Sequence, residues 1–246
     1  MHLTSVANPI VKSFAKLAEK KYRTESGLFW LEGAEYVARA VTAGWDVVDV
    51  MVEEGATSPV PASITTTRQV LAKITGKENP QPVLGLLKPR WPPLPPSSHE
   101  HWLASEKPRD PGSTCTILRT ADAAGVAGCI LVGEATDPFA PECARATVGS
   151  VVHVPLVTCT EAEFVAWAKG KQVIGTHLKA THSYRSLTPS NPCVVLMGNE
   201  SAGLTDTLTA ACTQLIKIPM VGHTESLNVA TATALMLYEI QKDTLR

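Results

Sequence analysis

Short apolar and β-branched runs alternate with segments of helical periodicity along most of this 246-residue chain. Such alternation predicts strands joined by crossover helices, which is an α/β fold with a mostly parallel sheet. The runs that predict strands are 29–33, 45–52, 83–87, 101–104, 129–132, 151–157, 172–178, 193–197 and 216–220. The segments that predict helices are 34–43, 68–75, 116–124, 142–148, 161–169 and 228–242, after a first helix that begins near Pro9.

The first predicted helix carries an apolar stripe and a separate basic stripe. Ile10, Phe14 and Leu17 recur at helical spacing and predict the buried face. The basic stripe, also at helical spacing, consists of Lys12, Lys16, Lys20 and Arg23. A stripe of this kind is usually a solvated helix face, but clustered cations also form phosphate-contacting edges. Charge alone leaves both interpretations open.

The composition changes abruptly near residue 90. Residues 90–98 carry four prolines in nine residues, a composition that cannot enter the interior of a sheet and is typical of a semi-rigid linker. We therefore predict an N-terminal α/β domain over residues 1–90, a linker over 91–100 and a larger α/β domain over 101–246.

Whole-chain properties limit the possible partners. The formal net charge of −1 predicts no strong bulk attraction to nucleic acid, so a polyanion site must come from local clustering. No apolar run approaches the ~20 residues that cross a bilayer, and the first residues lack a secretory apolar region. The six cysteines show no metal-ligand spacing, and four of them (Cys129, Cys143, Cys193 and Cys212) fit small core residues of a reduced cytoplasmic protein.

Three polar loops follow apolar segments of the second predicted domain, at residues 110–125, 198–203 and 222–228. The chain has no dinucleotide-binding glycine fingerprint, no phosphate-binding P-loop and no nucleophile elbow. Taken singly, each loop is explained by turn glycines or helix caps. Taken together, glycines beside Asn, Glu and Ser leave free backbone groups that suit an adenosine-like ligand.

Residues in these loops resemble the three motifs of SpoU-type (TrmH-type) RNA ribose 2′-O-methyltransferases of the SPOUT superfamily. The second motif is matched by Leu196-Met-Gly-Asn-Glu-Ser-Ala-Gly-Leu204. The third is matched by Ile218-Pro-Met, Glu225-Ser-Leu-Asn-Val and Leu237-Tyr-Glu239. Asp110-Pro-Gly and Thr116-Ile-Leu-Arg-Thr-Ala-Asp resemble the first motif, while Ser5, Asn8-Pro-Ile-Val-Lys12 and Phe29…Leu31-Glu-Gly33 are similar to the family's N-terminal substrate-binding domain.

This resemblance implies a C-terminal domain with a deep trefoil knot and an S-adenosylmethionine pocket built from backbone loops. It also implies a homodimer through the C-terminal domain, with the helix at 228–242 in the interface. The N-terminal domain is expected to bind structured RNA, either ribosomal or transfer RNA, and this expectation favours phosphate contact by the basic stripe. Recognition would use the shape and backbone of the RNA.

The resemblance also assigns individual residues. The positions expected to contact the cofactor are Met197, Gly198, Ile218, Met220 and Leu227. The polar active-site positions are matched by Glu200, Ser226 and Asn228, and the arginine proposed to activate the ribose hydroxyl is matched by Arg119. A guanidinium is a poor proton acceptor, so Arg119 is better suited to stabilise the developing alkoxide or to bind a phosphate. The methyl donor is already activated, so no metal is expected.

The first motif departs from the family pattern at two positions. Ser113 and Cys115 stand where the family usually has Asn and Gly. Ser113 is predicted on the RNA side of the site. Its hydroxyl is shorter than the asparagine side chain of the family pattern and lacks the second polar group of that amide.

We predict a methyltransferase that modifies a ribose 2′-hydroxyl of structured RNA. The sequence is also compatible with two alternatives. One is a catalytically weak or silent RNA-binding protein, which the altered first motif would indicate, and the other is a base-directed RNA methyltransferase.

Overall fold

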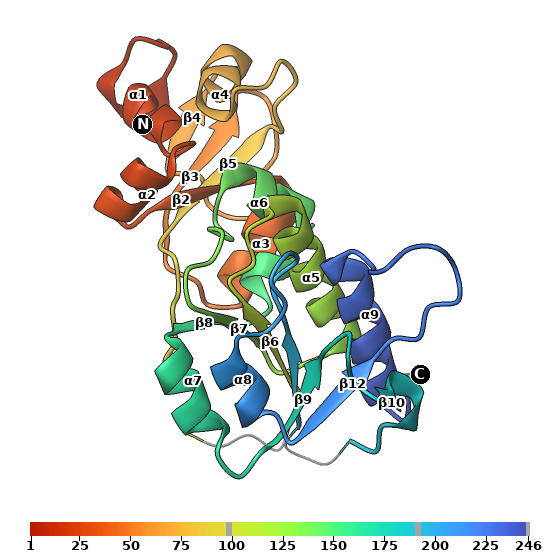
Figure 1. The fold of residues 1–246 in the computed structure, drawn as a ribbon. Coiled ribbons are helices and arrows are strands. Elements are labelled where there is room, and N and C mark those ends of the chain that lie inside the picture. The colour runs from red at the N-terminus through yellow and green to blue at the C-terminus, as the bar shows by residue number, and fades with distance from the viewer. Residues whose placement is uncertain (97–99, 190–192, 245–246) are drawn as a thin grey trace. The chain divides into compact units, whose positions relative to one another are not determined.

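The computed structural model describes residues 1–96, 100–189 and 193–244, and the chain forms two compact units (Figure 1). The first unit contains residues 1–90 and 137–153, and the second contains 91–136 and 154–246. The division after residue 90 falls at the start of the proline-rich segment. Residues 137–153 cluster with the first unit, whereas the sequence had placed them in the second domain. Residues 97–99 of the predicted linker lie outside the described residues.

The first unit is built on a five-stranded mixed sheet with the order β1-β4-β3-β5-β2. Its strands are β1 (His2–Leu3), β2 (Phe29–Glu32), β3 (Val47–Glu53), β4 (Ile64–Thr66) and β5 (Val83–Leu87). Its helices are α1 (Pro9–Lys16), α2 (Lys20–Ser26), α3 (Ala34–Thr42), α4 (Arg68–Thr75), α6 (Pro141–Ala146) and the 3-10 turn η1 (Ser150–Val152). Strand β5 runs antiparallel to both of its neighbours, and the other pairs are parallel. Short strands β1 and β4 carry little periodic signal and were not predicted.

The N-terminal basic segment forms two helices, so the prediction of one continuous helix is wrong. Helix α1 begins as expected, because the Ile10 N–H donates to Asn8 Oδ1 at 2.8 Å and Pro9 occupies the first turn. It ends at Lys16, and α2 begins at Lys20. The cations therefore do not form one stripe. The lysines Lys12, Lys16 and Lys20 are exposed, whereas Arg23 is 6% exposed.

Arg23 is committed to the interior of the first unit, which corrects the expectation that it contacts RNA. Its Nε and Nη2 atoms donate to Asp137 Oδ2 at 2.9 and 2.8 Å, and its Nη1 donates to the carbonyl oxygens of Leu17 and Ala18. The guanidinium thus satisfies carbonyl oxygens just after the end of α1 and forms an ion pair with Asp137 of the segment 137–153. A buried guanidinium with these partners has no free donor edge for a phosphate.

Replacing Arg23 with methionine is expected to lower the free energy of unfolding by about 3 kcal/mol or more, because the Asp137 carboxylate would lose its ion partner inside the fold. Urea unfolding followed by tryptophan fluorescence measures the loss. Lys20→Met is the matched control, since Lys20 is exposed on the same helix and its replacement should cost no more than about 0.5 kcal/mol. Equal losses in the two variants would contradict the structural role of Arg23.

The second unit contains a seven-stranded, all-parallel sheet with the order β10-β12-β9-β11-β6-β7-β8. Its strands are β6 (Trp102–Glu106), β7 (Cys129–Val132), β8 (Leu156–Cys159), β9 (Gln172–Thr176), β10 (His182–Ser183), β11 (Cys193–Met197) and β12 (Gln214–Lys217). Its helices are α5 (Pro111–Ala124), α7 (Glu161–Ala168), α8 (Asp206–Ala211), α9 (Val229–Ile240) and the 3-10 turn η2 (Tyr184–Ser186).

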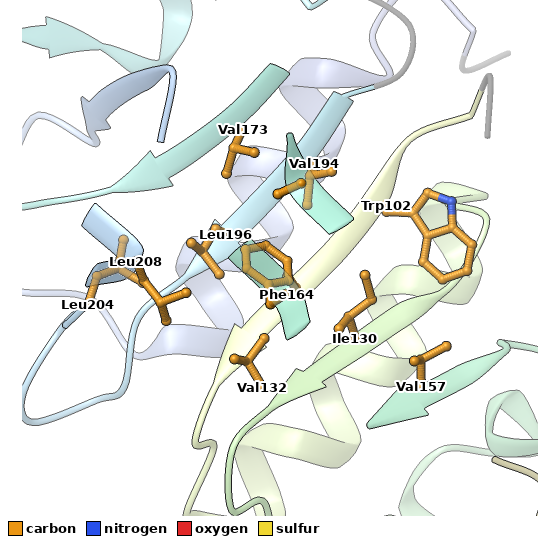
Figure 2. Packing of buried hydrophobic residues seen from close by; sticks show 12 residues of the cluster. Trp102, Ile130, Val132, Val157, Phe164, Val173, Val194, Leu196, Leu204 and Leu208 are labelled. Atoms are coloured by element: carbon orange, nitrogen blue, oxygen red, sulfur yellow. The ribbon is translucent and has the colours of Figure 1, made fainter. Parts of the chain in front are cut away.

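Helices cover both faces of this parallel sheet, as the fully apolar strands predict. Helices α7 and α8 cover one face, where Phe164 and Leu208 pack among Ile130, Val173 and Leu196 (Figure 2). Helices α5 and α9 pack against each other, and α9 also contacts β11 on the opposite face (Figure 1). The predicted α/β class is therefore confirmed, with a mixed sheet in one unit and a parallel sheet in the other.

Three predicted elements differ from the structure for identifiable reasons. The apolar run 151–157 is not one strand: η1 takes its start, and β8 begins only after Pro155. Helix α5 begins at Pro111, earlier than residue 116, because Asp110 caps it. Strand β12 ends at Lys217, before the proline that lacks an N–H for pairing. No helix within the described residues combines the length and apolar character needed to span a membrane.

Candidate active site

A cavity of about 340 Å³ lies at the carboxyl ends of β9, β11 and β12, which are neighbours in the parallel sheet. Four stretches of chain line it: 176–179, 197–203, 216–220 and 226–232. Its volume falls within the roughly 300–1,000 Å³ typical of small-molecule sites, and its position is the usual one in open α/β sheets.

Seven of the ten site residues predicted in the second unit line this cavity. The predicted cofactor residues all line it: Met197, Gly198, Ile218, Met220 and Leu227. Glu200 and Ser226 line it as well. Arg119, Ser113 and Asn228 are not among the lining residues. The second and third loop motifs, which follow β11 and β12, therefore meet at one place although they are separate in the sequence.

The loop that follows β11 requires glycine at its first position. A Cβ atom on Gly198 would lie 2.6 Å from the carbonyl carbon of Gly203 and 2.8 Å from the backbone nitrogen of Leu204. Real Cβ atoms do not approach a backbone so closely, so this loop closes on itself only with a bare Cα at residue 198. The close approach shapes one wall of the cavity.

Asn199 organises the same loop, a role that sequence reasoning missed. Its Oδ1 accepts hydrogen bonds from the Ser201 and Ala202 N–H groups at 3.0 and 3.2 Å, as in an Asx-turn. Its Nδ2 donates to the Lys107 carbonyl oxygen at 2.9 Å. Its backbone N–H and C=O both pair with Gly203. The second-motif loop is thereby tied to the segment that leads into α5.

A buried carboxylate strengthens that connection. Glu106, at the end of β6, is 2% exposed, and its Oε2 accepts a hydrogen bond from the Thr205 N–H at 3.0 Å. Its Oε1 lies 3.7 Å from the Lys107 Nζ. Lys107 has a positive φ of 40°, a costly backbone conformation for a residue with a side chain. The contacts of Glu106 and Asn199 on both sides hold this strained turn in place.

The third-motif loop offers unpaired backbone donors beside the cavity. The N–H groups of Ile218, Met220 and Leu227 have no hydrogen-bond partner among the described residues. Backbone donors held this way can recognise the edges of a heterocyclic base or the polar groups of an amino acid. The sequence predicted this loop from its glycine and polar content, and the structure shows the open donors.

A further wall comes from residues 176–179, which the sequence interpretation assigned no role. Thr176 ends β9, and His177 and Lys179 follow it, with the His177 Nδ1 accepting from the Lys179 N–H at 3.1 Å. A polar stretch directly after an apolar strand of a parallel sheet is the signal that could have identified it.

Arg119 and Glu200 both face solvent. Arg119 lies on an exposed side of α5, and its guanidinium has no hydrogen bond or ion pair with any described residue. Glu200 is exposed at the rim of the cavity, where its Oε2 accepts from the Asn199 Nδ2 at 3.2 Å. Both charges are thus free to meet a large polar ligand.

Ser113 is buried, which corrects the expectation that it contacts RNA. Its side chain is 4% exposed, and its hydroxyl donates to Asp110 Oδ2 at 2.7 Å. Asn228 Nδ2 in turn donates to the Ser113 Oγ at 3.3 Å. The hydrogen bonds from Ser113 also lower the pKa of Asp110, which therefore stays ionised at neutral pH. The first and third motifs are joined through this serine.

The cysteines with free thiols are not suited to nucleophilic chemistry. Cys129 and Cys193 are fully buried, and burial raises the pKa of each thiol to about 12. Burial raises the pKa of Cys159 and Cys212 to about 11, with a smaller contribution from Glu163 at Cys159. These four groups remain protonated at neutral pH and serve as packing residues.

The fold and cavity define a two-unit α/β protein with a cavity of small-ligand size at the carboxyl edge of a parallel sheet. Two family models match the chain and identify the class more closely. The model described as the SpoU rRNA Methylase family matches residues 101–238, and the model described as the MRM3-like substrate binding domain matches residues 8–85. This chain belongs to the SpoU rRNA methylase family.

Individual relatives cover nearly the whole chain. A crystal structure of an AdoMet-bound rRNA methyltransferase from Sinorhizobium meliloti superposes with a TM-score of 0.92 at 38% identity, covering 100% of this chain and 99% of that chain. A crystal structure of an RNA 2′-O ribose methyltransferase has a TM-score of 0.82 at 29% identity, with full coverage of both chains at 100%. The 23S rRNA (guanosine(2553)-2′-O)-methyltransferase RlmP of Bacillus subtilis (strain 168) is 29% identical over 97% of this chain and 98% of its own length.

Proposed function

We propose that this chain transfers a methyl group from S-adenosylmethionine to a ribose 2′-hydroxyl of structured RNA, either ribosomal or transfer RNA. The observation that carries the proposal is the meeting of the second and third family motifs around one cavity. Relatives of nearly the same length whose names state RNA 2′-O methylation support it. One of the similar structures holds the same cofactor.

The residues around the cavity fit S-adenosylmethionine. Backbone N–H groups of Ile218, Met220 and Leu227, which have no partner among the described residues, can donate to its polar groups, and apolar side chains such as Met197 supply walls for its adenine. Gly198 keeps that space open. When bound, the cofactor supplies a methyl group that is already activated on a sulfonium sulfur, so the protein has to align it with the acceptor.

The polar residues supply orientation and charge. Arg119 offers a guanidinium, which is suited to stabilise negative charge on the 2′-oxygen or on a neighbouring phosphate and is a poor proton acceptor. Glu200 and Ser226, at the cavity wall, and Asn228 beside it orient the ribose and the cofactor through hydrogen bonds. This assignment follows the family motif position by position.

The first unit provides the RNA-binding surface in this proposal. Lys12, Lys16 and Lys20 are exposed on α1 and α2, and the unit matches a substrate-binding domain. Lysines on a solvated surface contact phosphates without reading sequence, which suits recognition of RNA shape. Arg23 is not part of this surface.

We also propose that the chain acts as a homodimer and that its C-terminal domain is knotted. Leu235 and Tyr238 expose 36% and 48% of their surface on α9, which provides an apolar face for a second copy. Strand β12 lies between β9 and β10, so the chain re-enters the sheet between strands formed earlier in the sequence. That order supports the threading expected of this family.

Incubation with cofactor labelled on the methyl group is expected to label total ribosomal or transfer RNA. Because methylation removes the free 2′-hydroxyl that alkaline cleavage needs, the labelled position should resist alkali. Retained RNA binding without incorporation would indicate a silent RNA-binding protein. Label at an alkali-sensitive position would indicate a base as the acceptor. Comparing RNA from a knockout with RNA from its parent identifies the nucleotide.

A further inference from the structure

Ser113 connects the N-terminal caps of two neighbouring helices. Asp110 caps α5, because the Ser113 N–H donates to its Oδ2 at 2.7 Å. Asn228 caps α9, because its Oδ1 accepts from the Ala230 N–H at 2.9 Å. The Ser113 hydroxyl lies between these caps, bonded to Asp110 Oδ2 at 2.7 Å and to Asn228 Nδ2 at 3.3 Å. Helices α5 and α9 also pack directly against each other.

The direction of these hydrogen bonds is fixed by chemistry. An ionised carboxylate only accepts hydrogen bonds, so the single hydroxyl proton of Ser113 must go to Asp110. The Ser113 oxygen is then left as an acceptor, which matches the amide donor of Asn228. With both of its roles used inside the protein, Ser113 has no hydrogen left for a substrate.

The same contacts fix the orientation of the Asn228 amide. Its Oδ1 is held by the helix cap, with a second, longer bond from the Thr231 N–H at 3.4 Å. Its Nδ2 must therefore point toward Ser113, and a flip would place two acceptors together and two donors together. One Nδ2 hydrogen is used by Ser113. The second has no partner among the described residues, and the Asn228 side chain is exposed.

We infer that Ser113 is a positioning residue that aims the second Nδ2 hydrogen of Asn228 at the ribose to be methylated. The inference rests on the proposed 2′-O-methyltransferase function. It assigns a specific task to the serine that replaces the usual family asparagine: linking Asp110 to Asn228 without touching the RNA. Loss of the hydroxyl frees the amide to rotate within the cap, while the cofactor cavity is unchanged because Ser113 does not line it.

Side-chain NMR tests the positioning directly and needs no activity. The chain has only five asparagines, so selective ¹⁵N labelling gives few side-chain amide pairs, and Asn228→Ser identifies the pair of Asn228. Ser113→Ala should move this pair toward free-amide shifts and speed its exchange with water. Thr120→Ala is the matched control, because it removes from the same helix a hydroxyl whose one bond to a described residue goes to the Thr116 carbonyl oxygen. An Asn228 pair unchanged in Ser113→Ala overturns the inference.

Kinetics test whether Ser113 acts through Asn228. Ser113→Ala is expected to lower the single-turnover methylation rate about tenfold with unchanged affinity for S-adenosylhomocysteine. The same change made in Asn228→Ser, which keeps a capping hydroxyl, should cost less than about twofold. Equal losses in the two backgrounds overturn the inference.

Asp110→Asn is a second variant. It is expected to disturb the side-chain amide pair of Asn228 although the Ser113 hydroxyl is intact. If the wild type methylates no RNA, the proposed function is wrong. The NMR experiment still shows separately whether Ser113 positions the Asn228 amide.

Discussion

Replacement of Gly198 by alanine is expected to weaken the binding of S-adenosylmethionine by at least about 100-fold, or about 2.7 kcal/mol. The new Cβ would lie 2.6 Å from a backbone carbon of Gly203 and 2.8 Å from the backbone nitrogen of Leu204. Backbone atoms cannot rotate away as the end of a flexible side chain can, so the loop 198–203 has to open. This loop forms one wall of the cavity, and opening it moves the residues that hold the ligand.

Isothermal titration calorimetry with S-adenosylmethionine measures the loss, and thermal unfolding separates it from a loss of folded protein. The matched control is Gly222→Ala. Gly222 lies in the third-motif loop but does not line the cavity, and a Cβ there would meet nothing within 4 Å. Its affinity should stay within about twofold of the wild type. Unchanged binding in a folded Gly198→Ala protein would show that the loop is not a wall of the cofactor site.

The parts of the site that the sequence predicted are those encoded locally. Glycine and polar residues directly after an apolar strand mark a loop at the carboxyl edge of a parallel sheet, wherever the strands meet. The loops 198–203 and 222–228 have this sequence pattern, and residues of both line one cavity in the structure. The class of fold followed from the same alternation of strand and helix patterns. Asn8 as the cap of α1 is another local feature that the structure confirms.

The parts that could not be predicted depend on partners far away in the chain. Arg23 has the spacing of a solvated stripe, and only its pairing with Asp137, 114 residues later, makes it a buried structural residue. Ser113 meets Asn228 across 115 residues. The segment 137–153 has helical and apolar patterns like its neighbours, yet it clusters with the first unit. Periodicity describes which face of an element is apolar, but it does not identify what that face packs against.

Replacement of Arg119 by alanine is expected to lower the rate of methyl transfer by roughly 100- to 1,000-fold, because the charge that develops on the 2′-oxygen would lose its guanidinium. Affinity for the cofactor should hardly change, since Arg119 does not line the cavity. Stability should change by no more than about 0.5 kcal/mol, since the side chain is exposed and has no partner among the described residues. Single-turnover transfer, calorimetry and thermal unfolding measure these three quantities separately.

Arg109→Ala is the matched control for Arg119, because it removes the same charge from an exposed position just before α5. A comparable loss of rate in that variant would indicate general attraction of RNA, with no specific contact by Arg119. Arg119→Lys then separates charge from geometry. A lysine keeps the positive charge but offers a compact ammonium in place of two parallel donors, so a rate about tenfold below that of the wild type is expected. Full activity in Arg119→Lys would mean that a point charge suffices and that bidentate contact at this position is unimportant.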